Sequence, residues 1–351
     1  MKQKIITTND FLHSITDECF LNEYGCIKKE KKYHINNKYF NIEQSNFYYD
    51  NCKEKKKSLF RAKSSTLKDG GLRTKGLMKI SYKNIFIEND KFKAVDYNDR
   101  QYVFNLQEKS IQYAGGSLPL VTIITVIFNG EKEIADTIKS IIKHPYPNIE
   151  YIIIDGNSKD KTLNIIEKYS DHIDYWISEN DNGIYDAMNK GIDLATGEWI
   201  IFINAGDQLL TIPQESLLKQ YDLVAGKVIL NGTKETIFTP QFNWMLKIHN
   251  TLHHQGIFYN RKIMQYYSLE YKVFSDFDLN QKLFKQKIAI KLIDDKIAKH
   301  NLTGISNSSQ FFSENYIIVK KNFSYIYIII TFIYYKYKGL LNVLSNFNYH
   351  L

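Results

Sequence analysis

Cysteine is scarce in this chain, with only Cys19, Cys26 and Cys52 among 351 residues. Their spacing matches no zinc-ligand pattern, and such an odd, sparse set is typical of a reducing compartment rather than of a disulfide framework. The N-terminus has no continuous apolar stretch of the kind found in secretory signals. We therefore expect the folded region to lie in the cytoplasm.

The common nucleotide-binding signatures are missing as well. The chain has no GxGxxG after a predicted strand and no GxxxxGK[ST], which excludes the dinucleotide fingerprint and the Walker-type phosphate cradle. No nucleic-acid-binding module accompanies the densest lysine cluster, residues 53–57. Dispersed, solvated lysines are the favoured explanation of the formal net charge of +8, with attraction to an anionic surface as the alternative. We expect no nucleic-acid partner.

No uncharged run is long enough to cross a bilayer as a helix. Phe323–Tyr335, near the C-terminus, is shorter than the roughly 20 residues that a spanning helix needs. It is flanked by Lys320, Lys321, Lys336 and Lys338. Two interpretations stay open: an interfacial anchor with tyrosines and lysines at headgroup level, or a buried strand or helix of the fold.

Three regions differ in composition. Residues 1–118 are polar and rich in Lys and Asn, and short alternations at 85–87 and 102–104 predict strands there. Residues 119–310 have the pattern of a larger α/β domain, and residues 311–351 that of an amphipathic tail. We expect a β-rich N-terminal appendage, a central α/β domain and a tail with a membrane-associating character.

The central region alternates apolar strands with amphipathic helices. LVTIITVIF, from Leu120, and YIIID, which ends at Asp155, are typical of strands buried on both faces. IDYWIS and EWIIFIN predict a third and a fourth strand, and a helix is predicted over Ile184–Leu194. Strands that alternate with helices in this way predict a doubly wound α/β sheet.

Polar residues follow each of the four predicted strands. Ligands of open α/β sheets bind at the carboxyl ends of the strands. One aspartate at such an end is commonly a turn or capping residue, but four successive polar ends indicate a pocket. The residues are Asn129 and Gly130, Asp155, Glu179 and Asp181, and Asn204, Gly206 and Asp207.

Long blocks between Pro119 and Asp207 resemble the family 2 glycosyltransferases of the GT-A fold. They include PLVTIITVIFNGEKEIADTIKSI, IEYIIIDGNSKDKTLNII and SENDNGIYDAMNKGIDLATGEWIIFINAGD, in the order and spacing of that family. Weaker similarity continues to about Ser306. The resemblance implies transfer of a sugar from a nucleotide-sugar donor, with UDP or dTDP as its nucleotide, to a saccharide or lipid-linked saccharide.

The same resemblance implies inversion at the anomeric carbon and a place in bacterial surface-polysaccharide synthesis. We expect the protein on the inner face of the cell membrane as a peripheral protein. The QxxRW motif and the several spans of processive members of the family are absent, so we expect one sugar to be added per acceptor.

The resemblance also assigns donor-binding positions. Asp155 matches the aspartate that binds the base, and a carboxylate, which only accepts hydrogen bonds, suits the imino hydrogen of uracil or thymine. Asp181–Lys190 matches the segment that lines the diphosphate, although a solvent-facing Lys190 is equally open. The donor-binding residues predicted in this way are Thr125, Phe128, Asn129, Asp155, Glu179, Asp181, Asn189, Lys190 and Asn204.

The family's DxD metal signature departs from its usual form. Here it is Asn204-Ala205-Gly206-Asp207, which leaves Asp207 as the single carboxylate. Mg2+ and Mn2+ prefer hard oxygen ligands, and Asn204 offers a neutral one, with donor phosphates and water to complete the shell. The resemblance thus implies Asp207 as ligand of Mg2+ or Mn2+.

Val273–Leu279 (VFSDFDL) resembles the family's ED-type block, and in it Asp276 matches the catalytic base. Such a carboxylate takes the proton from the acceptor hydroxyl during attack. The alternative role of Asp276 is a helix cap, with Asp278 as the fallback base. Thr251–Gly256 resembles an HQ-containing loop, in which His254 and Gln255 are candidates for contact with acceptor or phosphate, or for a structural role.

Two other functions stay open. A nucleotidyltransferase would release pyrophosphate, but its basic, glycine-rich first loop is absent. A non-catalytic saccharide- or membrane-binding protein with a degenerate transferase fold is favoured by the altered DxD and disfavoured by the intact blocks. Asp69–Gly76 (DGGLRTKG) resembles a segment ahead of some similar transferases, without an assigned role.

Overall fold

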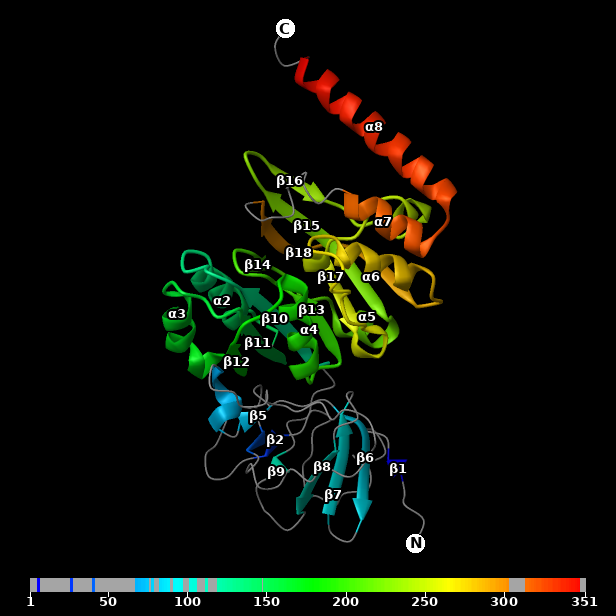
Figure 1. Cartoon of the computed structure of the whole chain (residues 1–351). Helices are drawn as coiled ribbons and strands as arrows, with labels where there is room; N and C mark the ends of the chain where they lie inside the picture. Colours follow the sequence, from blue (N-terminus) through cyan, green and yellow to red (C-terminus); the bar gives the residue numbers. More distant parts are fainter. Residues whose placement is uncertain are drawn as a thin grey trace.

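The computed structural model describes residues 67–75, 119–146, 148–302 and 313–347, and the backbone of eight short segments between residues 5 and 112. Its centre is one mixed sheet (Figure 1). In chain order, the strands of this sheet are β4 (Lys68–Gly70), β10 (Val121–Ile127), β11 (Ile149–Asp155), β12 (Tyr175–Ser178), β13 (Trp199–Phe202), β14 (Gln208–Leu209), β15 (Leu223–Asn231), β16 (Glu235–Phe238), β17 (Ile257–Asn260) and β18 (Ile290–Asn301). Across the sheet the order is β14-β18-β15-β17-β13-β10-β11-β12-β4, and β16 pairs with β15.

The four strands predicted from the sequence form the parallel centre of this sheet. β10 lies between β11 and β13, with Val121 opposite both Ile149 and Trp199, and β12 follows β11 on the outer side. Every residue of β10 and β11 is buried, because helices cover both faces of a parallel sheet of this kind. The predicted α/β class is therefore confirmed.

Helices on the two faces create two separate apolar cores. α2 (Ile134–Ile142) and α3 (Thr162–Lys168) pack on the face to which Ile123 belongs. α4 (Ile184–Leu194) packs on the face to which Ile124 belongs. Neighbouring strand residues point to opposite faces, so one β-branched run serves both cores. The predicted bounds of α4 agree with the observed ones.

The other half of the sheet is largely antiparallel. β17 pairs antiparallel with β13 and β15, while β18 runs parallel to β15. The single-turn helices η4 (Trp244–Lys247) and η5 (His254–Gly256) precede β17, and α6 (Ser275–Phe284) follows it. The remaining short helices are η3 (Ser170–His172), α5 (Glu215–Gln220) and η6 (Arg261–Ile263).

A segment from the N-terminal region completes one edge of the central sheet. β4 pairs antiparallel with β12, and η2 (Leu72–Lys75) follows it directly. Gly71, between the two, has φ of 95°, and a Cβ there would lie 2.7 Å from the carbonyl oxygen of Ile173. Only glycine fits this position, because other residues would meet both strain and a backbone clash. The predicted N-terminal region thus contributes an edge strand to the central sheet.

Further strands occur in the N-terminal region, as expected of a β-rich appendage. β6 (Tyr82–Glu88) and β8 (Gln101–Asn105) contain the two predicted alternating segments, and both pair with β7 (Lys91–Asp96). The other described strands here are β1 (Ile5–Ile6), which pairs with β6, β2 (Cys26–Ile27) with β9 (Ile111–Gln112), and β3 (Phe40–Asn41) with β5 (Leu77–Met78).

Two helices form the described part of the C-terminal tail. α7 (Ser313–Asn322) packs against α6, and α8 (Tyr325–Phe347) extends away from the central sheet (Figure 1). The uncharged run is therefore helical. Of the helices in the described part of the chain, none combines the length and the apolar character needed to span a membrane. The boundary expected at 310/311 lies outside the described residues.

Candidate active site

The loops after β10 and β11 are joined by hydrogen bonds at the carboxyl edge of the sheet. The amide of Asn129 donates to Oγ of Ser158, and Oδ1 of Asn129 accepts from the amide of Lys159, each at 2.8 Å. Asn129 adopts φ of 50° in this turn, a conformation that asparagine tolerates better than most residues. Phe128, at the end of β10, is 63% exposed. The edge thus has a fixed backbone and an open aromatic ring.

Asp155 lies beneath this edge with its carboxylate enclosed. It accepts hydrogen bonds from the hydroxyls of Ser158 and Ser178, and from the amide of Ser158 at 3.1 Å. The next residue, Gly156, allows Asp181 to approach, because a Cβ at Gly156 would lie 2.5 Å from Oδ2 of Asp181. Burial raises the pKa of the Asp181 carboxyl, against the Gly183 amide and the charge of Lys190. Gly156 therefore lets Asp181 lie close to the backbone that follows Asp155.

Lys190 is buried and does not face solvent. Its ammonium donates to the carbonyl of Asn180 at 2.6 Å and pairs with Glu179 at 3.1 Å and with Asp186 at 3.7 Å. These contacts come from the loop after β12 and from α4 itself. The predicted residues Glu179 and Lys190 are therefore in direct contact, and the lysine balances an acidic loop.

Two predicted donor-binding residues make internal hydrogen bonds instead of lining the open edge. Oγ1 of Thr125 donates to the carbonyl of Ile203 at 2.7 Å, inside the sheet. The side-chain amide of Asn189 forms two hydrogen bonds with the backbone of Tyr267: its Oδ1 accepts at 2.8 Å and its Nδ2 donates at 2.9 Å. The structure thus gives both side chains a packing role, and their contact with a donor stays a prediction.

Asp207 sits at the centre of a polar network after β13. Its Oδ2 accepts from Nε2 of Gln255 at 2.8 Å, and its Oδ1 contacts Nδ1 of His300 at 2.8 Å and the amide of Asn301 at 3.2 Å. The buried oxygens Oδ1 of Asn204 and Oε1 of Gln255 have no hydrogen-bond partner. A buried oxygen without a hydrogen-bond partner lowers the stability of the fold. These two oxygens therefore suit coordination of a bound cation.

These oxygens and the Asp207 carboxylate are of the hard type that Mg2+ and Mn2+ prefer. Within the described part of the chain, no three His, Cys, Asp or Glu side chains cluster in a way that could hold a metal ion. The residues present therefore fit a cation only if donor phosphates and water supply most of its ligands.

Asp276 lies in the first turn of α6, 8% exposed, with donors on three sides. Nδ2 of Asn250 donates to its Oδ2 at 2.9 Å, and the amide of Phe277 donates to its Oδ1 at 2.8 Å. The hydroxyl of Tyr185 donates to the carbonyl of Val273 and lies 3.4 Å from Oδ1 of Asp276. The carboxylate is thus oriented by groups from three separate segments.

His254 connects this carboxylate with the Asp207 network. Nδ2 of Asn204 contacts Nε2 of His254 at 3.2 Å, and Nδ1 of His254 lies 3.5 Å from Oδ2 of Asp276. Since the asparagine nitrogen can only donate, Nε2 accepts and Nδ1 carries the ring proton toward Asp276. Gln255, the next residue, contacts Asp207. The predicted HQ loop therefore joins the predicted metal ligand to the predicted base.

Asp278, the fallback base, has different surroundings. It is fully buried and pairs with Lys282 at 2.6 Å, and its Oδ1 accepts from Nδ2 of Asn322 at 2.8 Å. These contacts tie α6 to α7. The geometry therefore favours Asp276 over Asp278 as the group that faces a substrate.

No sequence pattern identified Tyr185, Asn250 or Glu314 as site residues. The carboxylate of Glu314, in α7, accepts from the amides of Lys272, Val273 and Phe274 at 2.9 to 3.2 Å and so fixes the chain just before Asp276. Tyr185 lies inside the matched block DNGIYDAMNKG, which is the one signal that could have identified it. Asn250 and Glu314 lie outside every motif.

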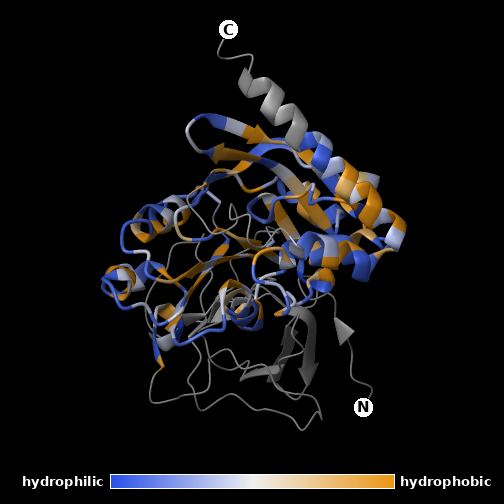
Figure 2. Ribbon diagram, turned by 45° about the horizontal axis from the view of Figure 1, so that its top comes forward, coloured by the Kyte–Doolittle hydropathy of each residue, from blue (hydrophilic) through white to orange (hydrophobic). Residues whose placement is uncertain are grey.

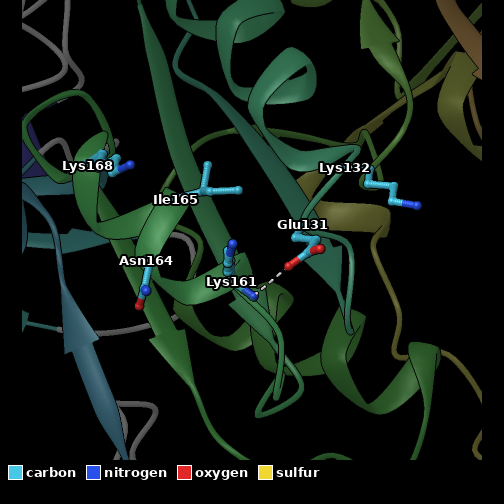
Figure 3. Close-up of a pocket in the computed structure, with 6 residues that line it drawn as sticks. All are labelled: Glu131, Lys132, Lys161, Asn164, Ile165 and Lys168. Carbon is cyan, nitrogen blue, oxygen red and sulfur yellow. Dashed lines mark hydrogen bonds between the residues drawn. The ribbon is translucent and has the colours of Figure 1, made fainter.

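A surface hollow of about 430 Å³ lies on the outer side of the same loops (Figure 3). The amide of Lys161 donates to Glu131 at 3.0 Å across it. None of the predicted site residues lines this hollow, whose walls are Glu131, Lys132, Lys161, Asn164, Ile165 and Lys168. The candidate site is therefore the polar network between Asp155 and Asp276.

Comparison with known proteins places this network in a known family. The model of glycosyl transferase family 2 matches residues 122–285. A PGL/p-HBAD biosynthesis glycosyltransferase of Mycobacterium bovis is 29% identical over 212 residues, which cover 54% of this chain and 80% of the relative. An uncharacterized glycosyltransferase of Mycobacterium tuberculosis is 39% identical over 93 residues, which cover 26% of this chain and 36% of the relative.

Among solved structures, S. aureus TarS 1–349 in complex with UDP aligns at 18% identity and a TM-score of 0.44. The alignment covers 58% of this chain and 65% of that chain, just under two thirds of its length. The matched residues 122–285 contain Asp207, Gln255 and Asp276, whereas His300 and Asn301 of the Asp207 network lie beyond them. Residues 122–285 therefore match the family 2 glycosyltransferases, this domain has the GT-A fold, and the protein is a glycosyltransferase.

Proposed function

We propose that the domain of residues 119–310 transfers one sugar from a UDP- or dTDP-sugar to a saccharide or lipid-linked saccharide, with inversion, in surface-polysaccharide synthesis. One observation carries the proposal. The loop at η5 contacts Asp207 through Gln255 and Asp276 through His254. This one loop thus contacts both the proposed site of the leaving group and the proposed base. Such an arrangement fits a direct displacement, because reactants held in fixed geometry react far faster.

The donor would lie across the carboxyl ends of the parallel strands, where open α/β sheets bind ligands. Phe128 offers an exposed ring for the nucleoside, and Asp155 offers a carboxylate for the base. The acidic loop beside them is balanced by Lys190, which keeps its net charge low enough to accept a diphosphate. This arrangement supports a nucleotide site and favours none of the donor sugars.

Asp207 and the oxygen of Asn204 would hold Mg2+ or Mn2+ together with the donor phosphates. A bound divalent cation would offset the negative charge that develops on the leaving nucleoside diphosphate. Gln255 and His300 orient the Asp207 carboxylate through the hydrogen bonds at its two oxygens. Their role matches that of the outer groups which orient ligands in other metal sites.

Asp276 would take the proton from the acceptor hydroxyl as that oxygen attacks the anomeric carbon. A carboxylate base within hydrogen-bond reach of the nucleophile contributes a rate factor of about 10² to 10⁴. Asn250 and His254 both contact Oδ2 of Asp276. These contacts fix the plane of the carboxylate and therefore the direction of Oδ1. Because attack and departure occur in one step on opposite faces of the sugar, the configuration is inverted.

A lipid-linked acceptor and a peripheral place on the inner face of the cell membrane complete the proposal. Their support is the exposed apolar side of α8, together with the net charge of +8. A purely soluble saccharide acceptor is the other outcome that the experiment below separates.

The test is a donor screen with purified full-length protein. UDP-, dTDP- and GDP-sugars would be mixed with Mg2+ or Mn2+, with soluble and lipid-linked saccharides as acceptors, and released nucleotide would be followed. We expect one donor to release a nucleoside diphosphate, and proton NMR of the product to report an inverted anomeric centre. Release of pyrophosphate would instead identify a nucleotidyltransferase. No binding of any donor by calorimetry would favour the non-catalytic alternative.

A further inference from the structure

The outward side of α8 is a continuous apolar face. Its residues follow a spacing of three and four positions, which places them on one side of a helix. Figure 2 shows apolar residues gathered along the described part of α8. We define the apolar face of α8 by Tyr325, Ile326, Ile329, Phe332, Ile333 and Tyr337, each 56–69% exposed.

Lysines dominate the charge on and next to this face, and one of them, Lys321, pairs with Glu270 at 2.6 Å. Lys320 and Lys321 precede α8, and Lys336 and Lys338 lie within it, all exposed. No acidic residue occurs between Tyr325 and Phe347. Lys336 comes four positions after Phe332, on the same side of the helix. A lysine within an apolar face can extend its ammonium to lipid headgroups, whereas a protein partner would have to bury it against an acid.

The opposite side of α8 is fastened to the segment that carries Asn250. The ring of Tyr334 stacks on His249 with centroids 4.5 Å apart and planes inclined by 6°. The hydroxyl of Tyr327 accepts from Nζ of Lys247 at 3.1 Å. Asn250, the residue after His249, donates to Asp276. Two contacts of α8 therefore lie next to the residue that orients the base.

α7 contacts the segment that directly precedes the same base. Glu314 accepts from the three amides of residues 272–274, directly before α6. At its far end, Asn322 donates to Asp278 at 2.8 Å and to Gln281 at 3.1 Å. The two C-terminal helices thus contact the segments that precede Asp276 and carry Asn250, while α8 presents an apolar face outward.

We propose that the apolar face of α8 docks in the plane of an anionic lipid surface and thereby places Asp276 at the level of the headgroups. Apolar side chains would enter the boundary between headgroups and acyl chains, and the lysines would contact the anionic groups. The consequence for catalysis rests on the proposed function, since a base held near the surface would meet the saccharide of a lipid-linked acceptor. Docking itself is independent of any donor.

The test is co-sedimentation of the full-length protein with vesicles of phosphatidylglycerol and phosphatidylcholine in equal parts. We expect the wild-type protein to bind them, to bind pure phosphatidylcholine more weakly, and to be released by salt. Ile329→Glu with Ile333→Glu should weaken binding by about tenfold or more, because two buried apolar side chains are lost. Ile237→Glu changes an isoleucine that is 50% exposed in β16 and should bind as the wild type does.

Unchanged vesicle binding in the double variant, with a melting curve like that of the wild type, would overturn the proposal. So would sedimentation velocity that shows a wild-type dimer and a monomeric variant, because a second copy would then cover the face. Turnover on a water-soluble acceptor separates this proposal from the proposed function. The double variant should keep that turnover and lose its advantage on a lipid-linked acceptor in vesicles, as a higher KM at unchanged kcat.

Discussion

Arg73 and Glu150 form an ion pair in which both side chains are completely buried. Arg73 comes from η2, ahead of the sheet, and also donates to the carbonyl of Leu194 at 2.9 Å. The Glu150 carboxylate accepts in addition from the hydroxyls of Thr122 and Thr196. These partners lie at the amino ends of the parallel strands, opposite the candidate site. Arg73 thus attaches the N-terminal segment to the amino ends of the parallel strands.

Removal of Arg73 should destabilise the domain strongly. Arg73→Ala leaves the buried Glu150 charge without its partner, which typically costs about 3–5 kcal/mol. Urea unfolding followed by tryptophan fluorescence would measure the change in free energy of unfolding. The exposed pair of Asp136 and Lys139 gives a matched control, and Lys139→Ala should change stability by less than about 1 kcal/mol. Equal effects of the two substitutions would contradict a supporting role for Arg73.

The same pair predicts a dependence of stability on pH. Burial alone would raise the pKa of Glu150, but the Arg73 charge and hydrogen bonds from Thr122 and Thr196 outweigh it and hold the pKa below its ordinary value of 4.5. A lowered pKa in the folded state adds stability above 4.5, and this contribution is lost as the pH falls through the lower, folded value. The free energy of unfolding of Glu150→Gln should therefore depend less on acid pH than that of the wild type. Parallel curves for the two proteins would refute this assignment.

The parallel half of the fold was predictable from the sequence because its signal is local. Each of the central strands is a short, mainly apolar run buried on both faces, and Ile184–Leu194 has an apolar face with a glycine just beyond its end. β18 has mixed burial, β17 is short, and the longer β15 is not followed by the helix that marks a parallel unit, so no comparable local pattern identifies this half of the sheet. The attachment of β4 to β12 depends on a tertiary pairing that no local pattern encodes.

The candidate site was predictable only where side chains belong to long motifs. Asp155, Asp207 and Asp276 were found because strand ends and family blocks mark them. Thr125 was assigned to the donor from its motif position alone, yet its hydroxyl bonds to the carbonyl of Ile203 inside the sheet. Asn250 was missed because its contact with Asp276 arises from the packing of a loop, and one sequence does not encode that packing locally.

Gln255 should matter for metal affinity without touching the chemistry. Gln255→Leu removes the hydrogen bond to Oδ2 of Asp207, and loss of a group that orients a ligand typically weakens metal binding by about 10–100-fold. Calorimetric titration of Mn2+ into protein with saturating UDP would measure it. Gln286→Leu, at an exposed position after α6, is the control and should leave the affinity unchanged. Equal Mn2+ affinity of the wild type and both variants would contradict the role of Gln255 in orienting the metal ligand.

Tyr185 should act by positioning the base. Burial, and then the charge of Asp276, raises the pKa of Tyr185 well above its ordinary value of 10, so the hydroxyl stays protonated. Tyr185→Phe removes its hydrogen bond to Val273 and should lower kcat by about tenfold, in line with the loss of one to two kcal/mol of hydrogen bonding, while the donor Kd stays constant. Tyr266→Phe removes a hydroxyl bound to Asp193, away from Asp276, and should leave kcat unchanged. A weaker donor Kd in Tyr185→Phe would indicate a structural role instead.

The strongest prediction concerns the two neighbouring aspartates of α6. Asp276→Asn keeps the shape of the side chain and removes its basicity, so kcat should fall by about 10²- to 10⁴-fold with little change in donor affinity. Asp278→Asn should instead lower the melting temperature, because it breaks the ion pair of the buried Asp278 carboxylate with the partly exposed Lys282, and should retain most of kcat. Rates would come from single-turnover assays, with donor affinity from calorimetry. If Asp278→Asn abolished turnover while Asp276→Asn retained it, the base would be Asp278, and the network of Asn250 and His254 around Asp276 would be structural.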